Sequence, residues 1–185
     1  HAISDHFDPM PDLREKFAKD KPHLAEKLDT LPLSVKRVFV PQGQPLGLGH
    51  AVLQAETLID EDEMFAVILA DDFIQSDESP LKPLIEAAES SQLASISVEQ
   101  VSSDRLSSYG VIAPDEWQAG VTSVNDIIEK PAAEDAPSDF GVIGRYVLPH
   151  SIFEHLKATK QDKSGEIQLT DALKASMLSS GLKAV

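Results

Sequence analysis

The chain lacks cysteine altogether, and this absence excludes several kinds of chemistry at once. Without thiols there is no disulfide, no thiolate metal site and no cysteine nucleophile. None of the many serines lies in the GxSxG pattern of a hydrolase nucleophile, so the sequence gives no support to a serine triad either. The absence of cysteine fits a cytoplasmic location best.

Long hydrophobic runs are also missing. The longest apolar stretches, such as residues 65–70, are far shorter than the roughly 20 residues that a membrane-spanning helix needs. We therefore expect no membrane span.

Basic residues are scarce, since 16 lysines and arginines stand against 31 acidic residues and the formal net charge is −15. The negative electrostatic field of such a chain repels polyanions, and no cluster of lysines and arginines is long enough to reverse the field locally. We therefore expect no nucleic-acid partner. A small phosphorylated ligand is compatible with the charge, because a few placed cations, backbone N–H groups or a divalent metal can neutralise it.

Strands and helices alternate along the chain, whose 185 residues with 42% hydrophobic content predict one compact domain over residues 1–185. A helical region over residues 11–28 is interrupted at Pro22, and a glycine-rich loop over residues 42–50 follows it. The expected strands are 35–40, 65–70, 94–101, 109–113, 121–129 and 140–148, and the expected helices are 51–58, 80–90, 150–158 and 169–178. This alternation predicts an α/β fold with an open, mostly parallel central sheet.

Asp71 and Asp72 follow the buried strand predicted over residues 65–70. In open α/β sheets, ligands bind outside the carboxyl ends of the strands. Carboxylate oxygens are hard ligands, and Mg²⁺ is often held by one or two of them together with substrate phosphates. Asp71 is thus a candidate anchor for a metal-bound nucleotide; the alternative is that both aspartates only cap or solvate a turn.

The loop over residues 42–50 has three glycines, which let the backbone approach a ligand closely. The amide of Gln42 both donates and accepts, as the edge of a nucleobase requires, and a glycine N–H nearby could complete the match. The loop fits neither the dinucleotide GxGxxG nor the P-loop pattern, so an ordinary strand-to-helix turn is the alternative.

Glu129 and Lys130 end another predicted strand, just before Pro131. The carboxylate suits sugar hydroxyls and the ammonium suits a phosphate, so the pair fits a sugar phosphate. The alternative is a surface ion pair at the junction of a strand and a loop.

Six segments occur in a fixed order along the chain: QGQPLGLGHA (42–51), ILADD (68–72), YGVI (109–112), IEKP (128–131), VIGRYVL (142–148) and GEIQLTDA (165–172). Together they resemble the bacterial UTP:glucose-1-phosphate uridylyltransferases, and HAISDHFD (1–8) also resembles the segment that follows the second strand in that family. The resemblance implies a Rossmann-like α/β/α nucleotide-diphosphosugar transferase fold and a homo-oligomer.

The resemblance also implies roles for individual residues. Gln42 and Gly47 would read the uracil, and Asp71 would bind Mg²⁺. Glu129 would accept the glucose hydroxyls, while Lys130 would contact the phosphate and act in catalysis with Asp71. The residues that would line the sugar pocket are Tyr109, Gly110, Val142 and Tyr146, with Glu166 helping to hold it.

The activity implied by the resemblance converts UTP and glucose 1-phosphate into UDP-glucose and pyrophosphate, by direct attack of the sugar phosphate on the α-phosphorus. Three alternatives stay open. A related enzyme could use dTTP, because uracil and thymine present the same hydrogen-bonding edge. The chain could instead be a non-catalytic remnant that only binds sugar nucleotide. A glycosyltransferase ranks last, since Asp71-Asp72-Phe73 is not an Asp-x-Asp motif.

Two further features of the family have no counterpart in this sequence: an opening strand with a GxGTRxxP-type loop that holds the triphosphate, and a downstream DxG segment with a second metal-binding aspartate. We therefore expect a chain that is incomplete at both ends and that binds sugar nucleotide without turning over UTP. Ala70 also stands where the family usually has proline.

Overall fold

The computed structural model describes residues 11–29 and 36–185, and the chain divides into two compact units, His1–Pro41 and Gln42–Val185. A single domain over residues 1–185 therefore stays a prediction. Residues 1–8, which contribute to the family resemblance, lie outside the described part.

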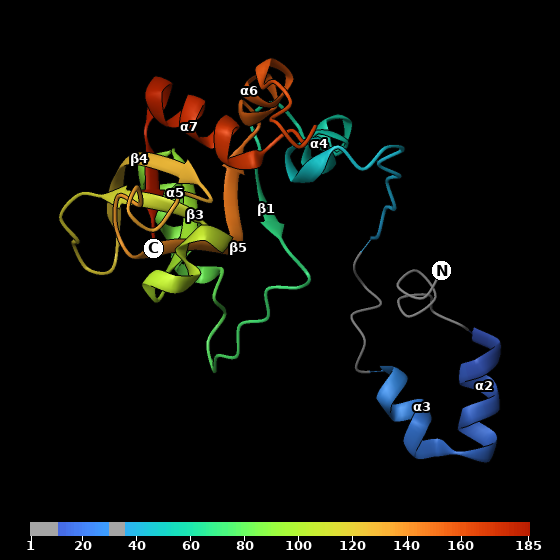
Figure 1. Cartoon of the computed structure of the whole chain (residues 1–185). Coiled ribbons are helices and arrows are strands. Elements are labelled where there is room, and N and C mark those ends of the chain that lie inside the picture. Colours follow the sequence, from blue (N-terminus) through green and yellow to red (C-terminus); the bar gives the residue numbers. More distant parts are fainter. Residues whose placement is uncertain (1–10, 30–35) are drawn as a thin grey trace. The chain divides into compact units, whose positions relative to one another are not determined.

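The described helices of the shorter unit are α2 (Pro11–Asp20) and α3 (Pro22–Asp29) (Figure 1). Their separation before Pro22 confirms the predicted interruption, because proline lacks the N–H that a continuous helix needs. The strand predicted over residues 35–40 is wrong for the described residues 36–40. These pair with none of the described strands, and Val38, Phe39 and Val40 are exposed.

The longer unit contains the sheet and most of the helices. Its helical elements are α4 (Gly47–Leu53), η1 (Glu56–Leu58), α5 (Lys82–Ser91), η2 (Ser103–Ser108), α6 (Ile152–Ala158) and α7 (Leu169–Ser180). Its strands are β1 (Met64–Ile68), β2 (Ala94–Gln100), β3 (Gly110–Pro114), β4 (Thr122–Glu129), β5 (Phe140–Pro149) and β6 (Leu182–Ala184). The elements predicted over this unit are all present within a few residues of their expected bounds. The sequence did not predict β6 or η2, and α4 begins inside the glycine-rich loop.

The α/β class is confirmed, but the prediction of a mostly parallel sheet is wrong. The six strands lie in the order β1-β5-β2-β6-β4-β3, and within the described residues only β2 and β6 pair in parallel. β5 runs antiparallel to both β1 and β2, and β3 runs antiparallel to β4. No helix connects β3 to β4, and a direct connection of this kind produces antiparallel neighbours.

Helices cover both faces of the sheet, in an α/β/α arrangement (Figure 1). Side chains of β5 point alternately to the two faces. Tyr146 and Leu148 belong to the main core, which α4, α6 and α7 complete. Val147 lies on the opposite face and packs with Leu84 and Ala88 of α5.

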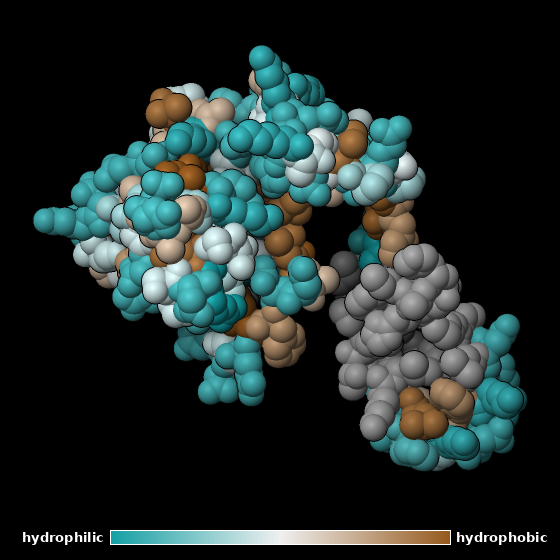
Figure 2. All heavy atoms as spheres, in the orientation of Figure 1, coloured by the Kyte–Doolittle hydropathy of each residue, from teal (hydrophilic) through white to brown (hydrophobic). Residues whose placement is uncertain are grey.

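β1 pairs with a described strand, β5, on one side only. Apolar side chains of β1 and α4 line a groove of about 420 Å³ along its other side. Hydrophobic surface gathers over β1 in the space-filling view (Figure 2). Within residues 11–29 and 36–185, no helix has the length and hydrophobicity needed to cross a bilayer.

Candidate functional site

A cavity of about 350 Å³ opens where the segment after β1, the beginning of β3, the end of β4, the middle of β5 and the first turn of α7 meet. It is lined by Leu48, Leu69, Asp71, Asp72, Ser108, Tyr109, Gly110, Glu129, Lys130, Val142, Gly144, Tyr146, Glu166, Gln168, Leu169 and Thr170. Eight of the ten residues given a role at the site in the sequence analysis are among them, and Gln42 and Gly47 are not.

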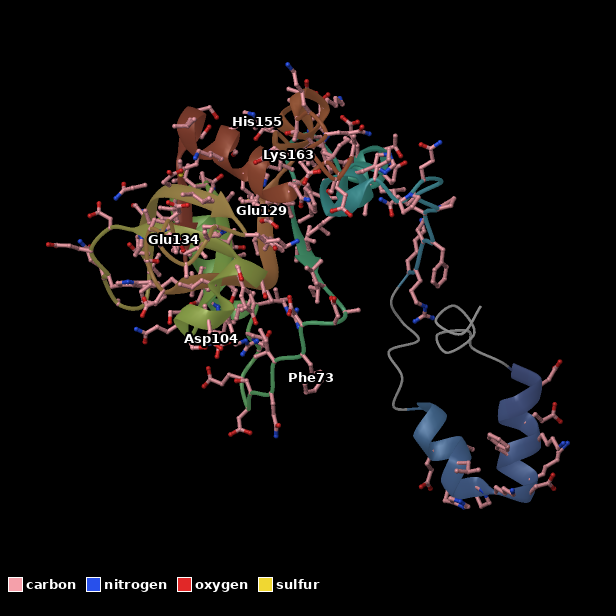
Figure 3. The ribbon with its side chains drawn as sticks, in the orientation of Figure 1. Phe73, Asp104, Glu129, Glu134, His155 and Lys163 are labelled. Carbon is pink, nitrogen blue, oxygen red and sulfur yellow. The ribbon has the colours of Figure 1, made fainter. Side chains whose placement is uncertain are left out.

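Glu129 lies at the end of β4, where its side chain is only 23% exposed (Figure 3). The hydroxyl of Thr170 donates a hydrogen bond of 2.6 Å to Glu129 Oε2, and Oε1 lies 3.5 Å from Lys130 Nζ. The backbone of Lys130 has a φ of +44° and its N–H donates to the carbonyl of Tyr109. This left-handed residue turns the chain out of β4 directly after the carboxylate.

Arg145 on β5 fixes the turn that carries the two aspartates. Arg145 is only 9% exposed, and its guanidinium donates to the carbonyl oxygens of Leu69 (3.1 Å), Gly144 (3.1 Å) and Asp72 (2.6 Å). The N–H of Leu69 in turn donates to the carbonyl of Gly144. The turn is therefore bound to β5 by both backbone and side-chain hydrogen bonds, while Asp71 itself is exposed.

Gly144 lets the aspartate turn approach β5 closely. A Cβ atom at this position would overlap the carboxylate of Asp72, so any side chain would push that carboxylate away. The φ of Gly144 is +26°, a conformation that also favours glycine.

The cavity lining is acidic, since it contains the carboxylates of Asp71, Asp72, Glu129 and Glu166 and a single ammonium, that of Lys130. Burial, and then the charges of Glu129 and Asp72, hold the pKa of the Tyr146 hydroxyl well above its usual value of 10. Tyr146 is therefore a permanent hydrogen-bond donor near neutral pH. Among the described residues, no three potential ligands cluster as a complete metal site.

The glycine-rich loop lies beside the cavity and is bonded to its wall. Gln42 Nε2 donates to the carbonyl of Gly47 (3.0 Å) and lies 3.2 Å from Nδ1 of His50. The N–H of Gly49 donates to the carbonyl of Ile167, and the N–H of Ile167 donates to the carbonyl of Leu46. The loop thus pairs with the segment whose Glu166 and Gln168 line the cavity.

The sequence did not assign a role to Thr170, Ser108 or Gln168, which also line the cavity. Thr170 lies within the GEIQLTDA segment (165–172), so the family resemblance identifies the segment as important but not the role of the threonine. Its contact with Glu129 joins residues 41 positions apart, and local periodicity carries no signal for such a pair.

Comparison with known proteins gives concordant results. The family model described as "Nucleotidyl transferase" matches residues 17–184. The chain is 40% identical over 174 residues to UTP–glucose-1-phosphate uridylyltransferase YngB of Bacillus subtilis, with 94% of this chain and 58% of the relative covered. It is 42% identical over 181 residues to the UTP–glucose-1-phosphate uridylyltransferase of Streptococcus pneumoniae, with 93% and 59% covered.

Solved structures are similar as well. A UDP-glucose pyrophosphorylase complexed with UDP-glucose superposes with a TM-score of 0.85 at 36% identity, covering 99% of this chain and 67% of that one. A UTP-bound UGPase from Acinetobacter baumannii gives a TM-score of 0.85 at 34% identity, covering 99% and 64%. The chain spans about three-fifths of the length of the two uridylyltransferases from Bacillus subtilis and Streptococcus pneumoniae. With its fold, its motifs and the family match over residues 17–184, the chain belongs to the nucleotidyl transferase family.

Proposed function

We propose that this chain carries the sugar-phosphate site of a UTP:glucose-1-phosphate uridylyltransferase, which forms UDP-glucose and pyrophosphate. The observation that supports this most is the single cavity in which Glu129, Lys130 and the Asp71–Asp72 turn meet. The relatives that are about 40% identical bear the name of this activity.

The geometry suits a reaction that needs positioning and charge neutralisation rather than a covalent intermediate. A phosphate oxygen of glucose 1-phosphate attacks the α-phosphorus of UTP, a new P–O bond forms, and the bond to the β-phosphate breaks to release pyrophosphate. Glu129 accepts hydrogen bonds from glucose hydroxyls, and Tyr146 and Gly110 line the sugar side of the cavity. Lys130 places its ammonium against the phosphate that attacks.

Magnesium is the metal we propose for this site. Asp71 and Asp72 supply the hard carboxylate oxygens that Mg²⁺ prefers, and two carboxylates with substrate phosphates are a common donor set for this ion. When bound, the ion would neutralise phosphate charge in a lining that has four carboxylates and one ammonium. The acidity of the lining is thus itself a reason to expect a cation with the nucleotide.

The uracil would lie on the loop of Gln42 and Gly47. Gln42 Nε2 is bonded within the loop, so its carbonyl oxygen is the atom that remains to accept from a base N–H. The dTTP-using enzyme and the non-catalytic remnant are not favoured by the named relatives. A homo-oligomer and a cytoplasmic location remain predictions.

Calorimetric titration of the 185-residue chain with UDP-glucose, UDP and dTDP-glucose in the presence of Mg²⁺ tests this function. We expect UDP-glucose to bind more tightly than either of the others. Equal binding of UDP and UDP-glucose would contradict a sugar site, and tighter binding of dTDP-glucose would favour the dTTP enzyme. Pyrophosphate release that requires both UTP and glucose 1-phosphate separates an enzyme from a module that only binds.

A further inference from the structure

Glu129 and Thr170 are brought together from β4 and from the first turn of α7. The Thr170 hydroxyl has a single proton, and it donates that proton to Glu129 Oε2 at 2.6 Å. Gly110 makes room for the pair, because a Cβ there would lie 3.2 Å from Glu129 Oε2 and 3.3 Å from Thr170 Oγ1. Three separate elements therefore converge on one carboxylate oxygen.

The two oxygens of Glu129 have different surroundings. Oε2 is held by Thr170 between Gly110 and α7, whereas Oε1 lies 3.5 Å from the exposed ammonium of Lys130. The position of Oε2, beside the N-terminal turn of a 12-residue helix, is also favourable for a negative charge. A carboxylate held by one oxygen has lost most of its rotational freedom before any ligand arrives.

We propose that Thr170 is a positioning residue for sugar recognition: its hydroxyl holds Glu129 Oε2, so that Oε1 is the oxygen presented to a glucose hydroxyl. This inference rests on the proposed function, because it explains the orientation of Glu129, the residue proposed to contact the glucose hydroxyls. Threonine, and not its isostere valine, is required at this position because valine places a methyl group against a carboxylate that is mostly buried.

Thr170→Val and Thr170→Ser in the 185-residue chain test the proposal, with UDP-glucose and UDP as calorimetric probes. Loss of a hydrogen bond to a charged group predicts about tenfold weaker binding of UDP-glucose by the valine variant. UDP has no glucose and should bind within about twofold of the unmodified chain. Thr170→Ser retains the hydroxyl and should restore most of the affinity. If Thr170→Val does not fold, Thr170→Ala removes the same hydroxyl without adding a methyl group.

A double-mutant cycle with Glu129→Ala separates positioning from a general structural role. If Thr170 acts through Glu129, Thr170→Val should have no further effect on UDP-glucose affinity once Glu129 is alanine. Additive losses, equal losses for UDP and UDP-glucose, or unchanged affinity in Thr170→Val would each overturn the proposal while leaving the proposed function in place. An unmodified chain that binds UDP and UDP-glucose equally would overturn the proposed function, and this inference with it.

Discussion

Arg145 Nη2 donates a 2.6 Å hydrogen bond to the backbone carbonyl oxygen of Asp72, and Nη1 donates to the carbonyl of Leu69. The two carbonyls bracket Asp71, so a buried cation on β5 determines where the proposed metal ligand lies. The link is specific to arginine, whose planar guanidinium reaches several acceptors at once.

Arg145→Met should therefore both destabilise the chain and weaken its magnesium-dependent binding of UDP-glucose. The substitution removes the guanidinium donors from the partly buried carbonyl oxygens of Leu69 and Asp72, which predicts a loss of about 1–3 kcal/mol in the free energy of unfolding. Urea denaturation and calorimetry measure the two effects. Lys157→Met removes a cation that is 45% exposed and paired with Glu56 and Glu154, and it should cost much less than Arg145→Met, because exposed ion pairs contribute little to stability. Equal losses in the two variants would contradict the role of Arg145.

Asp71→Asn should abolish the effect of magnesium on ligand binding while leaving the fold intact, because an amide is a poorer ligand for a hard cation than a carboxylate. The measurement is the UDP-glucose dissociation constant with Mg²⁺ and with EDTA. Asp77→Asn is the control, since Asp77 is also exposed but does not line the cavity. A magnesium effect of unchanged size in Asp71→Asn would rule out Asp71 as a ligand.

Lys130→Met should weaken binding of glucose 1-phosphate by about tenfold and binding of glucose by less than twofold, because only the phosphate presents an anion to the ammonium. Ligand-observed NMR is suited to both weak ligands. The matched control is Lys163→Met, on the exposed loop before Gly165 (Figure 3). If both ligands were weakened equally by Lys130→Met, the phosphate contact would be excluded.

Gly144→Ala should destabilise the chain more than Gly120→Ala. Both glycines have a positive φ, +26° and +82°, so both substitutions carry a backbone cost of about 1–2 kcal/mol. A Cβ at Gly120 has nothing within 4 Å, whereas one at Gly144 overlaps the Asp72 carboxylate and predicts about 1–3 kcal/mol more. Thermal unfolding of the two variants makes the comparison, and similar midpoints would show that the aspartate turn moves aside freely.

Asp162 should stabilise the loop before α7 in a pH-dependent way. Hydrogen bonds from the Ser164 hydroxyl, the Gln168 amide and the Glu166 backbone N–H hold the pKa of this carboxyl below its usual value of 3.8. The stabilisation is therefore complete above pH 3.8 and is lost as the pH falls through the lowered pKa. Unfolding of Asp162→Asn, measured from pH 7 to pH 2, should differ most from the unmodified chain above pH 4. A constant difference across this range would contradict the argument.

Local patterns in the sequence predicted the elements of the longer unit well. The spacing of hydrophobic residues distinguishes helices from strands, and proline and glycine mark where helices begin and end. α5 begins with Pro83 in its first turn, and α7 ends before Gly181, whose φ is +107°. The relative direction of paired strands could not be predicted in this way. β5 runs antiparallel to β1 and β2, but no local pattern within residues 140–149 distinguishes an antiparallel strand from a parallel one.

The candidate site was predicted to the extent that its residues follow strands. Asp71 and Glu129 end predicted strands, and the structure brings them to one cavity. Thr170 and Arg145 act through contacts between positions 41 and 73 or more residues apart, and such contacts follow from the packing of α7 and β5 rather than from local spacing.

Ile167 is joined to Leu46 and Gly49 by hydrogen bonds between backbone groups. This determines which substitutions, insertions and deletions the two segments can tolerate. Side chains at Leu46 and Ile167 can vary without removing either hydrogen bond, whereas a Cβ at Gly49 would come within 2.7 Å of the Ile167 carbonyl. A residue inserted or deleted in either segment would shift the pairing by one peptide unit and separate the proposed uracil loop from the sugar wall. The connection between the two segments thus tolerates most side-chain substitutions at Leu46 and Ile167 but is sensitive to changes in chain length.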